Sequence, residues 1–106
     1  MFESLPIRHN LSMSEILDRP VLAAPTALAR EIDGNFTIYD KQKDSVMVLN
    51  DSASAIWRLC DGRTGSAIAA ELASSFAASP GEIERDVASV LEELTANGLL
   101  VNPAHL

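Results

Sequence analysis

The chain passes from strand to helix within one short stretch, Ser45-Val46-Met47-Val48-Leu49-Asn50-Asp51-Ser52-Ala53. Its first five residues are mostly β-branched or apolar, which is typical of a strand. The next three, Asn50-Asp51-Ser52, offer side-chain oxygens that can cap a helix. Apolar residues then recur at helical spacing until Asp61-Gly62, which predicts a first helix that ends there.

Two further strands are predicted before this stretch. Residues alternate in character from Leu28 to Asp33, as expected of a half-exposed strand, and Asp33-Gly34 predicts a tight hairpin turn. A second alternating segment, Phe36 to Tyr39, leads into the charged run 40–44, which predicts a solvated loop. We therefore expect a three-stranded antiparallel sheet.

Two more helices are predicted after the first one. Thr64 opens the second helix, whose apolar stripe is Ile68, Leu72 and Phe76, and the chain then turns at Ala77-Ala78. The third helix has the clearest boundaries, because Ser79, Pro80 and Glu82 form a capping box and Asn97-Gly98 follows the last turn. The apolar tail from Leu99 to Val101 could pack back or form a short strand. The predicted fold class is α+β, a winged-helix-like arrangement in which a three-stranded antiparallel sheet is followed by three helices.

The chain divides into an N-terminal arm, residues 1–26, a globular domain, residues 27–101, and a short tail, residues 102–106. With 106 residues it suits a single domain. In the arm, Pro6, Pro20 and Pro25 interrupt any long helix or central strand. Residues 14–17 could form a helical turn, or residues 21–22 could contribute a strand.

Composition excludes several classes of protein. The net charge is −7 and the pI about 4.6, so the chain lacks the basic surface that nucleic-acid binding requires. We expect no nucleic acid and no membrane as partners, whereas a peptide carrying Lys or Arg would fit. A single cysteine, Cys60, excludes an intramolecular disulfide. Since no signal peptide or membrane span is recognisable, we expect a cytoplasmic protein.

No catalytic or metal-binding group can be assembled from the reactive residues. Cys60 has no histidine near it in sequence, because the two histidines are His9 and His105. We therefore expect a buried structural cysteine, no metal, no cofactor and no enzymatic activity. Trp57 is expected in the core, whereas Tyr39 is equally compatible with packing on the sheet surface and with contact to a peptide or partner enzyme.

The third predicted strand is apolar on both faces. Val46 and Val48 point one way, and Met47 and Leu49 point the other. Something must therefore cover the second face, either the domain's own helices or a partner. The strand also lacks the Lys, Pro or bulge that usually protects a sheet edge, so it is open to addition of another strand.

The sequence resembles that of PqqD-like proteins. The run Val48–Thr64 looks like the family signature of leucine-asparagine, two residues, alanine, a helix and then aspartate-glycine. The segments 82–87 and 91–94, followed by Gly98-Leu99, resemble the family's last helix. The likeness extends from about Leu28 to Val101.

This resemblance implies a function in peptide modification. Members of the family bind the leader segment of a ribosomally synthesised precursor peptide as an added strand, in a groove beside the third helix, and serve a separate modifying enzyme. It implies a leader peptidase of a lasso-peptide pathway as the favoured enzyme and a radical SAM enzyme as the next. The implied peptide-binding residues are Ser45, Val46, Met47, Val48, Leu49, Asp86, Val87, Val90 and Leu94.

Two other functions compete with this one. The helical trio, with Arg58 and Arg63 beside it, would suit a winged-helix DNA-binding regulator, which salt-dependent binding to duplex DNA would reveal. The unprotected strand edge would also suit a dimerisation or adaptor domain.

Overall fold

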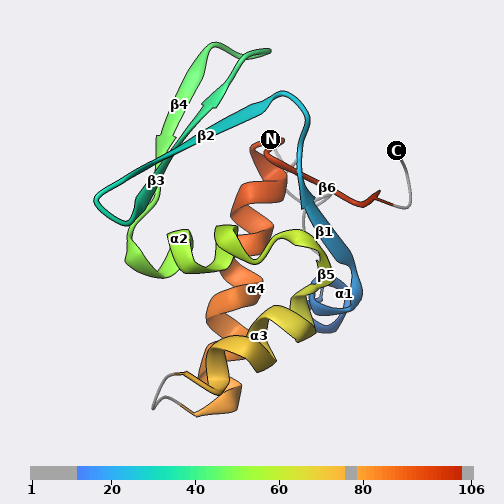
Figure 1. Ribbon diagram of the computed structural model, residues 1–106. Coiled ribbons are helices and arrows are strands. Elements are labelled where there is room, and N and C mark those ends of the chain that lie inside the picture. Colours follow the sequence, from blue (N-terminus) through green and yellow to red (C-terminus); the bar gives the residue numbers. More distant parts are fainter. Residues whose placement is uncertain (1–11, 76–78, 104–106) are drawn as a thin grey trace, which may run out of the picture.

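The computed structural model describes residues 12–75 and 79–103, which form helices and strands in two small antiparallel sheets (Figure 1). In chain order the elements are α1 (Met13–Asp18), β1 (Pro20–Ala23), β2 (Ala27–Ile32), β3 (Asn35–Asp40), β4 (Ser45–Val48), α2 (Asp51–Arg58), β5 (Asp61–Thr64), α3 (Gly65–Ala73), α4 (Pro80–Ala96) and β6 (Leu100–Val101). The predicted α+β, winged-helix-like class is confirmed, since the sheet β2-β3-β4 is followed by three helices.

The sheet β2-β3-β4 is built from two hairpins. Asp33 and Gly34 have φ angles of 54° and 87° between the paired residues Ile32 and Asn35, which is the two-residue turn that the sequence predicted. The second turn differs from the prediction. Asp40 belongs to β3 and is buried. Its carboxylate is satisfied within the chain, because it accepts hydrogen bonds from the Gln42 N–H at 2.9 Å and the Lys43 N–H at 3.4 Å. The solvated loop therefore begins one residue later.

The second sheet, in the order β5-β1-β6, was not predicted. Its central strand β1 pairs through Leu22 with Asp61 of β5 and with Val101 of β6. The first predicted helix was consequently drawn too long, since α2 ends at Arg58 and Asp61–Thr64 forms β5. Gly62, at which the sequence predicted the helix to end, has a φ of 108° and lies within β5.

Part of the predicted arm packs on the core. Ser12 caps α1 with a capping box, and both structures considered for this segment occur, a helix and then a strand. Ile16, Leu17 and Val21 are buried in the main hydrophobic cluster. The division of the chain at residue 26 stays a prediction, but residues 16–21 contribute to the same core as the helices.

Side-chain caps fix the three later helices where the sequence placed them. Asn50 caps α2, Thr64 caps α3, and Ser79 and Glu82 form the capping box of α4. These helices bury Trp57, as expected, and Leu91 and other apolar side chains of α4. The predicted stripe residue Phe76 and the turn at residues 77–78 lie outside the described residues.

A buried serine joins the end of the sheet to α2. The Phe36 N–H donates to Ser54 Oγ at 2.9 Å, and the Ser54 hydroxyl donates to the carbonyl oxygen of Leu49 at 3.3 Å. The hydroxyl thus replaces a direct bond between the strand ends, and Ser54 is only 1 % exposed. This contact fixes the direction in which α2 leaves β4.

Replacing Ser54 with alanine should lower the free energy of unfolding by about 1–3 kcal/mol, because it leaves a buried N–H and a buried carbonyl without a partner. Urea denaturation measures the change. The matched control is Ser52→Ala on the exposed side of the same helix, where a change within about 0.5 kcal/mol is expected. Equal effects of the two substitutions would show that the bridge contributes nothing.

Candidate functional site

Strand β4 is an edge of its sheet and has a free row of main-chain groups. The Leu49 N–H donates to the Phe36 carbonyl oxygen at 2.8 Å. Because alternate residues of an antiparallel strand turn towards the same neighbour, Val46 and Val48 direct their N–H and C=O groups to the open side. Both side chains are exposed as well. An extended chain could therefore add beside β4.

A hollow separates this edge from α4. It has a volume of about 160 Å³ and is lined by residues of β4, the start of α2 and the second half of α4: Met47, Val48, Leu49, Asn50, Ala53, Val90, Glu93 and Leu94. Leu49 and Leu94 are core residues that form its floor, whereas Val90 is partly exposed and Glu93 exposed. The hollow thus combines an apolar floor with one carboxylate at the rim.

A second hollow, of about 170 Å³, continues the first one towards the turn between β3 and β4. Its lining includes Ser45, Val46 and Met47 from β4, and Asn97 and Leu99 from the end of α4. Lys43 bridges the two sides here, because its Nζ donates to the Asn97 carbonyl oxygen at 3.0 Å. This bond ties the hairpin turn to the end of the helix and fixes the width of the gap.

A third hollow, of about 90 Å³, lies at the other end of α4, against α2 and α3. It is lined by Ser52, Ala55, Ile56, Leu72, Ile83, Asp86 and Val87. Along α4 the three hollows follow one another, with residues 83–87, 90–94 and 97. We call these three hollows together the α4 trough.

The structure brings the predicted peptide-binding residues together only in part. Met47, Val48 and Leu49 share a hollow with Val90 and Leu94, and Ser45 and Val46 line the next one. Asp86 and Val87 line a different hollow, because they lie about one turn before Val90 on α4, against α2 and α3.

Sequence reasoning missed two polar residues of the trough, Glu93 and Asn97. Their spacing from Val90, three and seven residues, places them on the same side of α4. This helical period was the signal in the sequence that could have identified them.

Near the trough, some charged side chains have a partner of opposite charge within the chain and others have none. Asp86 and Glu93 have carboxylates without a hydrogen bond or ion pair to any described residue. Arg58 of α2 and Arg63 of β5 are paired instead, Arg58 with Glu31 and Arg63 with Asp61 at 2.9 Å. The hydrogen bonds from Arg63 hold the pKa of Asp61 below its ordinary value. The trough therefore favours a cationic ligand over an anionic one.

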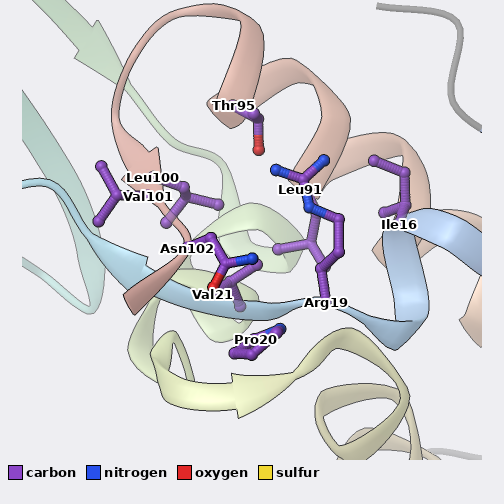
Figure 2. Close-up of a pocket in the computed structure, with 9 residues that line it drawn as sticks. All are labelled: Ile16, Arg19, Pro20, Val21, Leu91, Thr95, Leu100, Val101 and Asn102. Carbon is purple, nitrogen blue, oxygen red and sulfur yellow. The ribbon is translucent and has the colours of Figure 1, made fainter. Parts of the chain in front are cut away.

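A small pocket between α1, β1 and α4 is a gap in the packing of these elements. Figure 2 shows its lining, in which Arg19 reaches from the start of β1 towards Thr95 near the end of α4. Its volume is only about 10 Å³, the space of a single water molecule. It joins Ile16 and Val21 to Leu91 and is too small for a larger ligand.

The single cysteine is structural. Burial raises the pKa of Cys60 to about 12, and its thiol donates to the Ile56 carbonyl oxygen at 3.3 Å. A thiol with such a pKa is almost wholly protonated at neutral pH and is a poor nucleophile.

Within residues 12–75 and 79–103, no group of three histidine, cysteine or acidic side chains could hold a metal ion. In the same part of the chain, no helix has both the length and the apolar character to cross a membrane.

Comparisons with known proteins give two kinds of match. The family model described as coenzyme PQQ synthesis protein D (PqqD) matches residues 36–100. A search of curated proteins finds no match. Among solved structures, one titled "TbiB1 in Complex with the TbiA(beta) Leader Peptide" is 21 % identical with a TM-score of 0.71, covering 74 % of this chain and 93 % of that one. Another, "Lasso peptide synthetase B1 complexed with the leader peptide", is 26 % identical with a TM-score of 0.69, covering 77 % and 98 %.

Proposed function

Because the chain belongs to the PqqD family, we propose that it binds the leader segment of a ribosomally synthesised precursor peptide and presents it to a separate modifying enzyme. The leader adds to β4 as a further antiparallel or parallel strand and fills the α4 trough. Solved relatives carry titles that describe complexes with leader peptides, which supports this ligand class.

The observation that carries the proposal is the free edge of β4 beside an apolar trough. A strand that adds here bonds to the N–H and C=O groups of Val46 and Val48 and lies about 4.8 Å from β4. Every second side chain of that strand then points towards α4, where Met47, Val90 and Leu94 line the hollow. Main-chain bonds provide general affinity and the pockets provide selectivity.

Apolar leader side chains contribute more to affinity than charges do. Each exposed ion pair with Asp86 or Glu93 adds only about 0–1 kcal/mol. A fully buried aliphatic side chain contributes about 1.5–3 kcal/mol. The carboxylates therefore select for leaders that carry Lys or Arg, while the trough sets the strength of binding.

The role proposed for the chain is that of a non-catalytic adaptor. Cys60, the most reactive residue type present, is buried with a raised pKa. The favoured enzyme is a cysteine leader peptidase of a lasso-peptide pathway, since one relative is titled a lasso peptide synthetase B1. A radical SAM enzyme is the alternative.

A DNA-binding role is less well supported. The arginines that suggested it, Arg58 and Arg63, are both engaged with carboxylates of this chain. Breaking these pairs would cost free energy, and the net charge of −7 would repel phosphates.

An NMR titration with the cognate leader, encoded next to this chain's gene, tests the function. We expect amide shifts at residues 45–49 and on α4 from residue 83 to 97, with little change on β2. The absence of binding at several hundred micromolar leader would refute the proposal. Binding with shifts confined to other surfaces would show that the groove is misplaced.

A further inference from the structure

The sheet β2-β3-β4 has an open face that is unusually apolar. Of the six large hydrophobic side chains that are exposed among the described residues, five lie on this sheet: Leu28, Ile32, Tyr39, Val46 and Val48. Their exposed fractions range from 37 % to 72 %. Figure 1 shows the sheet projecting from the helices, and the exposure of these side chains indicates that the described helices leave this face open.

The strand register places these side chains on the same face. Leu28 pairs with Tyr39, which pairs with Val46. Thr37 pairs with both Arg30 and Val48 in the next row. Since paired residues of antiparallel strands point to the same side, the open face is continuous from β2 to β4, and we call it the open sheet face.

An added leader strand would enlarge this face. This step rests on the proposed function, in which the leader lies beside β4. Its side chains that do not enter the α4 trough must point to the opposite side of the sheet, next to Val46 and Val48. The open sheet face thus becomes wider by one strand only when the leader is bound.

Charge indicates what covers the open sheet face. Arg30 is the one charged side chain on this side of the three strands, and it has no hydrogen bond or ion pair within the described part of the chain. On a second copy, the carboxylate adjacent to this face belongs to Asp44, which already accepts a hydrogen bond from the Tyr39 hydroxyl at 2.8 Å, so that pairing with Arg30 would compete with this bond. Two copies would also each carry a net charge of −7 and repel one another.

From this we infer that the open sheet face docks the enzyme that acts on the leader, through an apolar enzyme surface that contains a carboxylate for Arg30. The enzyme contacts the chain and the leader strand together. It therefore binds the complex more tightly than the free chain. Apolar area supplies the affinity, and the single ion pair fixes the orientation.

Two variants test this surface without touching the leader groove. Leu28→Thr/Ile32→Thr removes apolar area from β2 and places β-branched threonine, which strands favour, at both positions, and Arg30→Glu reverses the charge. Both sites lie on β2, about 10 Å or two strand spacings from β4. The matched control is Met13→Thr, the sixth exposed large hydrophobic residue, which lies on α1.

Each protein is titrated with fluorescent cognate leader, and then with the purified enzyme encoded in the same gene cluster, with and without leader. We expect leader affinity within twofold of wild type for all variants. Enzyme affinity should fall at least tenfold for both β2 variants and remain unchanged for Met13→Thr. Leader should increase the wild-type enzyme affinity.

Three results would overturn the inference. Enzyme affinity that is unaffected by either β2 variant would exclude the open sheet face. A wild-type dimer in sedimentation that the β2 variants dissociate would assign the face to a second copy. If the enzyme affinity is the same with and without leader, the enzyme does not contact the chain and the leader strand together. A wild-type chain that fails to bind leader, in contrast, refutes the proposed function, while the leader-free enzyme titrations still report on the face.

Discussion

Replacing Val48 with proline should weaken leader binding by about 30- to 150-fold. The substitution removes the outward N–H and leaves a carbonyl of the bound leader without a donor, and the ring occupies the path of the added strand. A buried unsatisfied carbonyl costs about 1–3 kcal/mol. With the steric term, a loss of about 2–3 kcal/mol is expected, and every 1.4 kcal/mol is tenfold in affinity. Fluorescence anisotropy of labelled leader measures the change.

The fold should tolerate this substitution. Proline is acceptable in a sheet only where its missing N–H faces away from the neighbouring strand, and the bond from the Leu49 N–H to Phe36 indicates that Val48 meets this condition. The matched control is Ala29→Pro. Ile32 and Asn35 close the hairpin as a mutually bonded pair, so Ala29 also turns its N–H outward, but at the opposite edge.

Ala29→Pro should leave leader affinity within about twofold of wild type, since the leader is expected at β4 only. Circular dichroism confirms that both variants fold. If the two prolines weaken binding equally, or if neither does, then the leader does not add as a strand to β4.

Features set by local sequence were predictable. The hairpin at Asp33-Gly34 and the capping box at Ser79 each depend on residues within four positions of one another. Their physical causes, positive φ angles and unpaired helix N–H groups, act without help from the rest of the fold. This explains why the main sheet and the starts of the three later helices were placed correctly.

The second sheet could not be predicted in the same way. Strand β5, Asp61–Thr64, has no apolar alternation, and its central partner β1 begins with a proline. These strands exist because residues about 40 positions apart are brought together, as Leu22 and Asp61 are. Only tertiary packing provides that information.

The candidate site was predictable at β4 but not along α4. An unprotected apolar strand can be read from residues 45–49 alone, whereas the rotation of α4 relative to the sheet cannot. Asp86 was therefore expected on the part of the helix against which the leader lies, and the structure places it in the hollow between α4, α2 and α3. The sequence left open whether the domain's own helices or a partner cover the second face of the third strand. Val46 and Val48 are exposed, so the described helices do not cover that face.

Replacing Leu17 with alanine should lower the free energy of unfolding by about 2–4 kcal/mol, because it removes three buried carbon atoms and leaves a cavity. Leu17 is 5 % exposed. It lies where α1 meets α3 so closely that a methyl group added at Gly65 would stand 3.0 Å from the Cα of Leu17 and 2.9 Å from the Cδ1 of Leu91. Helices in such close contact have little freedom to close a cavity. Urea denaturation of the full chain measures the loss.

The control for this prediction lies on the same helix. Met13 is 44 % exposed, so Met13→Ala should change the free energy of unfolding by less than about 0.5 kcal/mol. The pair separates two views of the segment that the sequence describes as an arm. If α1 and β1 contribute little to the core, Leu17→Ala will change the free energy of unfolding as little as Met13→Ala does. If α1 and β1 are part of the core, Leu17→Ala will reduce a total stability of about 5–15 kcal/mol by a large fraction, and the whole domain will unfold in one cooperative transition at lower urea concentration.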